Sequence, residues 1–315
     1  CSTQTHSSVD KAAITLGASG FAEIRDAMAQ VAARIASERS LPSSDYRDVL
    51  RALKRDALAP DRVVPLYRER LAALEAIIER ERLVTLPRRP VSIRLASEAE
   101  SAAIPAPYYN PPRLVGNRGE SGEFVLPTRN PNAPADAILD DYAAQAVAWT
   151  LAAHEARPGH DLQFTTMVEQ GVSLARAVFA FNSTNVEGWA LYAESFVLPH
   201  LPPEGQLFSL QWRLMRAARA FLDPMVNLGR MTPEAAKGFL VREVGVSEAF
   251  AQQEADRYAF DAPGQAVTYF YGYARLRALR TRAELLLGSR FDARRFNDLV
   301  LAQGLLPPEL LERAV

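Results

Sequence analysis

The stretch that decides the interpretation of this chain is His154-Glu155-Ala156-Arg157-Pro158-Gly159-His160. It follows a predicted helix whose apolar residues recur at spacings of three and four: Leu139, Tyr142, Ala146, Trp149 and Ala153. Two of the four histidines of the chain lie in this stretch, six positions apart. Proline lacks an amide donor and glycine allows an unusual turn, so Pro158 and Gly159 predict a break in the helix.

A histidine followed by a glutamate at the end of an apolar helix is typical of the zinc peptidase motif, in which histidines at i and i+4 hold zinc. The glutamate of that motif removes a proton from the water on the metal. In this chain the second histidine comes at i+6, which on an unbroken helix places the two rings roughly 120° apart instead of about 40°. The predicted break allows both rings to reach one ion. The alternative is a helix end at which His160 only caps the next turn.

A metal held by two histidines needs a third ligand, and a carboxylate is the natural choice. The stretch Glu187-Gly188-Trp189-Ala190-Leu191-Tyr192-Ala193-Glu194 is predicted to form a helix that begins 33 residues after His154. Its two glutamates are seven positions apart and share one face, so one can bind the metal while the other orients a ligand. The alternative is a capping box formed by Thr184 and Glu187.

Composition excludes several functional classes. The chain has 315 residues, 48% of them hydrophobic, which is enough for one large domain or two ordinary ones. Its formal net charge of −1 argues against nucleic-acid binding, which needs a concentrated basic surface. No uncharged apolar run approaches the ~18 residues of a membrane span. The single cysteine excludes an internal disulfide and a thiolate metal site.

The periodicity predicts a mainly α (α+β) fold. An apolar stripe from Phe21 to Ile35 predicts a first helix, and Ser43-Ser44-Asp45 offers an N-cap for a short second one. Further helices are predicted at about 61–83, 184–198, 205–222, 233–244, 247–258, 265–288 and 293–302. Alternation within Val91–Leu95 and Gly122–Leu126 predicts two strands in a proline-rich insert over 87–134, with the strand region at about 88–130. We therefore predict a polar tail over residues 1–11 and a single mainly helical domain over 12–315.

The two segments together resemble a known bacterial family. The pattern His-Glu-x-x-Pro-Gly-His-x-x-Gln, followed by Glu-Gly-Trp-Ala-Leu-Tyr-Ala-Glu, is similar to the family called domain of unknown function 885. The resemblance extends over roughly residues 12 to 315 and includes Arg219, Asp223, Glu254–Tyr258 and Pro263–Tyr269. That family is placed among the gluzincin-like zinc metallopeptidases, which implies a zincin-like helical fold. Its members are usually about twice this length, which implies that an N-terminal helical half is absent from this sequence.

The resemblance also implies roles for particular residues. His154, His160 and Glu187 would hold one zinc ion per chain, and Glu155 would act first as general base and then as general acid. Glu194 would support a ligand. The chain departs from the family pattern at three positions where histidines are expected, namely Asp161, Asn227 and Asn297. None of these positions is a proposed ligand. The departures instead affect the expected substrate preference or a secondary polar network.

Two tyrosines and two arginines are further candidates. Tyr269 matches the tyrosine that precedes a glycine in the family and would donate a hydrogen bond to the oxyanion, with Tyr271 as its neighbour. A core position on an amphipathic helix is the alternative for Tyr269. Arg257 and Arg280 would anchor a substrate carboxylate through paired hydrogen bonds. The alternative for both arginines is a structural pairing with Glu254 or Asp256, which we favour for Arg257.

The resulting expectation is a zinc-dependent hydrolase, specifically a metallopeptidase that cleaves short peptides. Two alternatives stay open, namely a non-catalytic binding or scaffold protein of the same fold and a zinc hydrolase of another amide or ester. The expected partner is a peptide or small amide, with no nucleic acid and no membrane span. If Cys1 is the first residue of a mature lipoprotein, the protein belongs to the cell envelope. If Cys1 is only a fragment boundary, the expected location is the cytoplasm.

Overall fold

The computed structural model describes residues 3–55, 60–104, 106–127, 142 and 144–315. Its internal contacts divide the chain into two compact units. The first unit comprises Cys1–Ala57, Asp136–Val147 and Leu201–Tyr271, and the second comprises Leu58–Ala135, Ala148–His200 and Gly272–Val315. The single domain expected over residues 12–315 stays a prediction.

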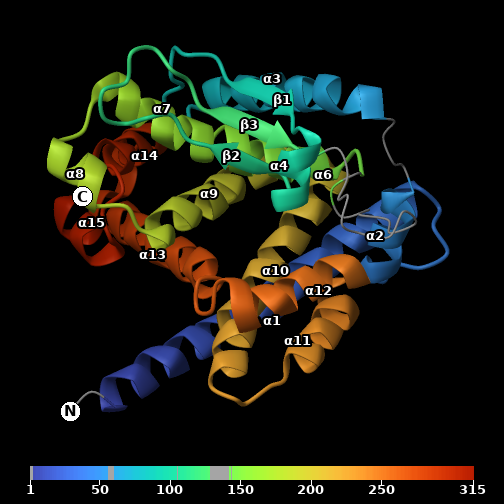
Figure 1. Cartoon of the computed structure of the whole chain (residues 1–315). Helices are drawn as coiled ribbons and strands as arrows, with labels where there is room; N and C mark the ends of the chain where they lie inside the picture. The colour runs from blue at the N-terminus through green and yellow to red at the C-terminus, as the bar shows by residue number, and fades with distance from the viewer. Residues whose placement is uncertain (1–2, 56–59, 105, 128–141, 143) are drawn as a thin grey trace. The chain divides into compact units, whose positions relative to one another are not determined.

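The first unit is helical. It contains α1 (Thr3–Glu38), α2 (Tyr46–Lys54), α10 (Pro203–Asn227), α11 (Pro233–Phe239), η4 (Leu240–Val244), α12 (Glu248–Asp256) and η5 (Arg257–Asp261). Helix α1 packs along α10, and it begins within the segment expected as a tail (Figure 1). The predicted apolar stripe of α1 faces this contact, because the ring of Phe21 packs edge-on against Phe221 of α10 at 5.9 Å, and Met28 and Ile35 of the stripe are fully buried. Asp45 caps α2 as expected, since its side chain accepts a hydrogen bond from the amide of Arg47.

The second unit contains a small sheet beside a long helix. Its first elements are η1 (Pro60–Arg62), α3 (Val63–Arg80), β1 (Ser92–Leu95), α4 (Glu98–Ala103), β2 (Tyr108–Asn110) and β3 (Glu123–Leu126). The strand order is β1-β3-β2, with β1 parallel and β2 antiparallel to β3 (Figure 1). Phe124 of the central strand is fully buried, and its ring packs edge-on against Tyr67 of α3 at 5.4 Å. The sheet is thereby fixed to α3.

The remaining helices of the second unit follow the sheet. They are α6 (Val147–Leu151), η2 (Ala152–Ala156), α7 (His160–Gln170), α8 (Leu174–Phe179), α9 (Ser183–Val197), η3 (Leu198–His200), η6 (Gly288–Arg290), α14 (Ala293–Ala302) and α15 (Pro308–Ala314). Helix α13 (Val267–Leu287) begins in the first unit and enters the second at Gly272. The backbones of α9 and α13 touch, because a Cβ at Gly188 would lie 2.6 Å from the carbonyl carbon of Gly272.

The predicted mainly helical fold with a short β insert is confirmed. Both predicted strands are present, and the third strand, Tyr108–Asn110, was not predicted. The start of the predicted helix at Leu139 lies outside the described residues, and the described helix begins at Val147. Within the described part of the chain, none of the helices has the length and hydrophobicity that a membrane crossing needs.

Candidate metal centre

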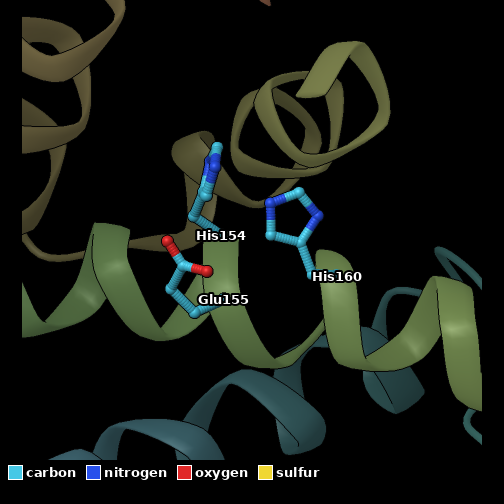
Figure 2. Close-up of side chains that lie close together, drawn as sticks. All are labelled: His154, Glu155 and His160. Atoms are coloured by element: carbon cyan, nitrogen blue, oxygen red, sulfur yellow. The ribbon is translucent and has the colours of Figure 1, made fainter. Parts of the chain in front are cut away.

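Three short elements of the second unit bring the predicted ligands together. His154 and Glu155 lie on η2, a turn of π-helix that continues α6, and His160 is the first residue of α7. Figure 2 shows the side chains of His154, Glu155 and His160 directed towards one another. One ligand atom from each of these three residues lies within 4.8 Å of the other two, and all three side chains are buried. Glu187 joins them from the first turns of α9.

The break between the two histidines has a clear structural basis. The backbone leaves the helix at Arg157, which is extended (φ −126°, ψ 131°), and α7 begins three residues later. Only glycine fits at position 159, because a Cβ there would lie 1.8 Å from the carbonyl oxygen of His154. The indole of Trp189 donates hydrogen bonds to the carbonyl oxygens of Pro158 (3.0 Å) and Gly159 (3.3 Å). The predicted break is therefore present and is held by α9.

The two imidazoles converge on one carboxylate oxygen. Atom Nε2 of His154 lies 3.4 Å from Oε2 of Glu187, and Nε2 of His160 lies 3.6 Å from the same oxygen. Among the described residues, no group forms a geometrically acceptable hydrogen bond to this buried oxygen. Buried polar atoms of this kind are rare in native proteins and indicate an ion or a water as the missing partner. These three side chains are therefore suited to hold a cation.

A second glutamate orients the first histidine. The fully buried carboxylate of Glu194 accepts hydrogen bonds from Nδ1 of His154 at 2.6 Å and from Oγ1 of Thr150 at 2.8 Å. This bond fixes the ring so that its Nε2 faces Glu187. Metal-binding histidines almost always have such a partner on the other ring nitrogen.

The alternative role for Glu187, as part of a capping box with Thr184, is wrong. The N-cap of α9 is Asn182, whose side chain accepts a hydrogen bond from the amide of Asn185. Thr184 is the second residue of the helix and cannot act as its N-cap. Glu187 is consequently free of any capping role and points to the histidines.

The histidines and glutamates of the cluster stabilise one another in their charged forms. Burial lowers the pKa of His154, but the nearby carboxylates of Glu187 and Glu194 outweigh burial and raise that pKa to about 9. Burial raises the pKa of Glu187, whereas the imidazoles of His154 and His160 hold that pKa well below its usual range. A metal ion needs neutral imidazole, so its binding must displace the proton from His154.

Comparison with known proteins places this chain in a family. Residues 2–315 match the family described as "Bacterial protein of unknown function (DUF885)". The chain belongs to this family. The family membership expected from the motifs is thus confirmed, whereas the relation of DUF885 to the gluzincin-like zinc peptidases stays a prediction.

Two solved structures share the fold of this DUF885 chain. The "putative lipoprotein from Colwellia psychrerythraea" is 24% identical with a TM-score of 0.83, and the match covers 97% of this chain and 51% of that one. The "putative lipoprotein of unknown function from Shewanella oneidensis" is 22% identical with the same TM-score, over 96% of this chain and 56% of that one. The DUF885 chain therefore spans about half the length of these solved proteins. None of the curated proteins matches it.

Three further candidates of the DUF885 chain, Arg257, Tyr269 and Tyr271, lie in the first unit. Arg257 donates to the Tyr269 hydroxyl at 3.2 Å and lies 3.5 Å from the carboxylate of Glu254. The pairing with Glu254 agrees with the structural alternative for Arg257. The metal centre belongs to the second unit, and the expected roles of these three residues at that centre stay predictions.

Arg280 lies in the second unit and has protein partners. It donates to the Glu284 carboxylate at 2.7 Å and to the Tyr192 hydroxyl at 3.2 Å. Burial raises the pKa of Tyr192 to about 12, although Arg280 opposes the rise. Tyr192 donates in turn to the side-chain oxygen of Asn297 at 2.8 Å. These contacts favour a structural role for Arg280, and its expected role at a substrate carboxylate stays a prediction.

Two residues that contact the metal centre were not predicted from the sequence. Thr150 lies one helical turn before His154, and this spacing is the only feature of the sequence that places it near the site. Because threonines are common in apolar helices, the spacing alone does not identify it. Trp189 belongs to the quoted helix motif, but its bonds to the Pro158 and Gly159 carbonyls depend on the packing of α9.

Proposed function

We propose that this DUF885 chain is a zinc-dependent hydrolase that cleaves peptide bonds in short peptides. The observation that carries the proposal is the convergence of two Nε2 atoms on one oxygen of Glu187, at 3.4 and 3.6 Å. Ligands roughly 2.0–2.1 Å from zinc at the corners of a tetrahedron lie about 3.3 Å apart. The two observed distances fit a zinc ion that would be held by His154, His160 and Glu187.

The donor set also fits the chemistry of the proposed reaction. Zinc held by two imidazoles and a carboxylate polarises a carbonyl group and lowers the pKa of water to roughly 7. The buried carboxylate of Glu155 lies beside the two histidines, with one ligand atom of each of the three residues within 4.8 Å of the other two. A carboxylate next to the proposed ligands is placed to contact the attacking water.

The residues of the chain then have distinct tasks. Glu155 takes a proton from the attacking water as general base and gives it to the leaving amine as general acid. Glu194 keeps His154 in one orientation through the 2.6 Å bond to Nδ1. Burial of the site excludes bulk water from the base and strengthens these electrostatic interactions.

The test combines metal content with hydrolysis. Wild type and Glu155→Gln are loaded with zinc, their zinc content is measured, and both are incubated with a peptide library that is read by mass spectrometry. Glu155→Gln is expected to keep its zinc and its fold and to lose about 10²- to 10⁴-fold in rate, the usual contribution of a general base. Glu312→Gln is the control, because it removes a carboxylate that instead pairs with Arg275.

The outcomes separate the competing functions. Hydrolysis that survives Glu155→Gln contradicts the assignment of the base. A zinc-loaded wild type that cleaves esters or other amides but no peptide contradicts the assignment as a peptidase and supports a zinc hydrolase with another substrate. A zinc-loaded wild type that cleaves nothing points to a binding protein of the same fold.

A further inference from the structure

The position of His160 depends on the three residues that precede it. Arg157, Pro158 and Gly159 redirect the chain between η2 and α7, so their conformation sets the direction in which the His160 ring enters the site. A metal site tolerates little error in ligand position. Any group that fixes this turn therefore acts on the metal through His160.

A buried ion pair spans the turn. Nε of Arg157 donates to Oδ2 of Asp161 at 3.0 Å, and the two side chains are only 5% and 2% exposed. Arg157 lies three residues before His160, and Asp161 follows it directly. His160 thus lies between the two partners in the sequence, and their ion pair connects the turn to the first residues of α7.

Both ends of the pair are anchored to other elements of the second unit. Nη1 of Arg157 donates to Oε1 of Glu75 on α3 at 2.6 Å, and Nη2 donates to the carbonyl oxygen of Arg89. At the other end, the hydroxyl of Tyr109 on β2 donates to Oδ1 of Asp161 at 3.2 Å. The pair thus connects the turn to α3, to the segment before β1 and to β2.

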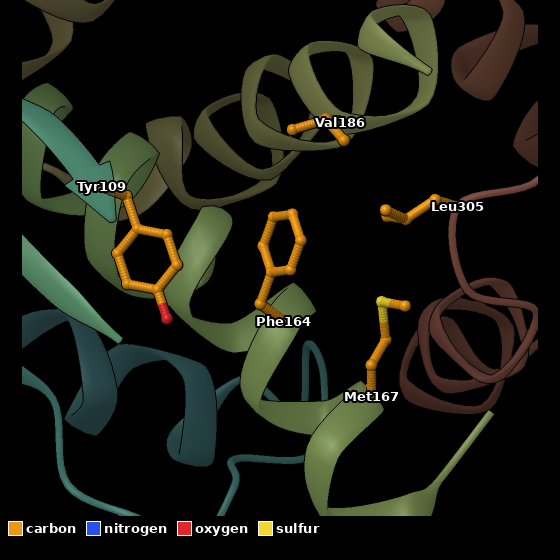
Figure 3. Close-up of a cluster of buried hydrophobic side chains, with 5 residues drawn as sticks. All are labelled: Tyr109, Phe164, Met167, Val186 and Leu305. Atoms are coloured by element: carbon orange, nitrogen blue, oxygen red, sulfur yellow. The ribbon is translucent and has the colours of Figure 1, made fainter. Parts of the chain in front are cut away.

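Tyr109 also contacts the histidine itself. Its ring is nearly parallel to that of His160 (26°), with the centroids 6.5 Å apart. Figure 3 shows Tyr109 beside Phe164, in an apolar cluster that also contains Met167, Val186 and Leu305. The residue that bonds to Asp161 is therefore held by the core and contacts His160 at the same time.

We propose that the Arg157–Asp161 ion pair, with Tyr109 and Glu75, is a positioning device that fixes His160 for metal binding. This inference rests on the proposed function and adds residues that the metal motif does not contain. Burying two charges costs about as much as their attraction returns, so a buried ion pair is weak evidence for stability. Its geometric effect, a fixed turn between two ligands, is the better explanation for this pair.

The test removes the pair without leaving a buried charge. The variant Arg157→Met/Asp161→Leu keeps similar volumes, and replacements of this kind are often neutral or stabilising. We expect the metal-free variant to fold and to unfold cooperatively, while its zinc affinity, measured by chelator competition, falls about 10- to 100-fold, as for other supports of metal ligands. The visible absorption of the cobalt(II)-loaded variant should also change, because it reports ligand geometry.

The control is a second buried pair of the same type. Arg219 and Glu254 lie 2.5 Å apart with side chains 6% and 5% exposed, in the first unit. The matched variant Arg219→Met/Glu254→Leu is expected to bind zinc like wild type. If the first double variant does not fold, Arg157→Lys replaces it, since one ammonium group cannot reproduce the three guanidinium contacts, and about a 10-fold loss is expected.

The outcomes distinguish this inference from the proposed function. A folded double variant, or Arg157→Lys, that binds zinc as tightly as wild type and gives the same cobalt spectrum overturns the positioning role and leaves the metal centre intact. A wild-type chain that takes up no zinc overturns the proposed function and the inference with it.

Discussion

Replacing Gly159 by alanine tests the turn between the two histidines directly. An alanine Cβ at this position would lie 1.8 Å from the carbonyl oxygen of His154 and 2.5 Å from that of Ala153. Both obstacles are backbone atoms, so no side-chain rotation relieves the contact. The turn must move by more than 1 Å to restore a normal separation of at least about 3 Å.

The size of the effect follows from what that movement disrupts. Overpacking of a rigid site costs about 1–3 kcal/mol. The same movement separates the Pro158 and Gly159 carbonyls from the indole of Trp189, and an unsatisfied buried donor costs about 1–3 kcal/mol. We therefore expect Gly159→Ala to lower the free energy of unfolding by about 2–6 kcal/mol.

Urea unfolding followed by circular dichroism measures this change. The control is Gly238→Ala on α11, where the nearest atom to the new Cβ is the flexible end of Arg242 and helix propensity favours alanine. That control is expected to stabilise the chain by about 0.5–1 kcal/mol. A Gly159→Ala chain as stable as wild type, or stabilised like the control, would refute the reasoning.

One further prediction concerns the same turn, and another concerns the first unit. Trp189→Phe keeps the aromatic packing but removes the indole N–H, so we expect a loss of about 1–3 kcal/mol in urea unfolding, and an unchanged midpoint would show that these hydrogen bonds do not stabilise the turn. Burial raises the pKa of Glu254, but the ion pair with Arg219 outweighs burial and lowers that pKa to about 2. Because the folded pKa lies below the usual value of 4.5, this stabilisation of about 3 kcal/mol is complete above pH 4.5 and is lost as the pH falls towards 2. The slope of stability against pH in this window should decrease in Glu254→Gln, and an identical slope in both chains would contradict the assignment.

Local patterns were sufficient to predict most helices. The apolar stripe of α1 and the cap at Asp45 are determined by neighbouring residues, and both are present. Strand β2 was missed because its three residues, between prolines, carry too short a pattern to detect. Short strands of this type form only when a partner, here β3, supplies the hydrogen bonds.

The candidate site was predictable to the extent that its residues lie in two motifs. The seven-residue spacing of Glu187 and Glu194 put both on one face, and the structure directs both towards His154. The partners of Arg280 and Arg257 were not predictable, because an arginine chooses among carboxylates that only the fold brings near. The cap at Asn182 shows the same limit, since Thr184 and Glu187 also fit a capping pattern.

The most direct test of the metal centre is elemental analysis of the purified chain. Wild type, His154→Ala and His200→Ala are measured side by side after equilibration with zinc and removal of the excess. We expect about one zinc per chain in wild type, none in His154→Ala, and one in His200→Ala, whose histidine instead lies 3.6 Å from Glu81. No zinc in wild type, or equal zinc in wild type and His154→Ala, would contradict the metal centre.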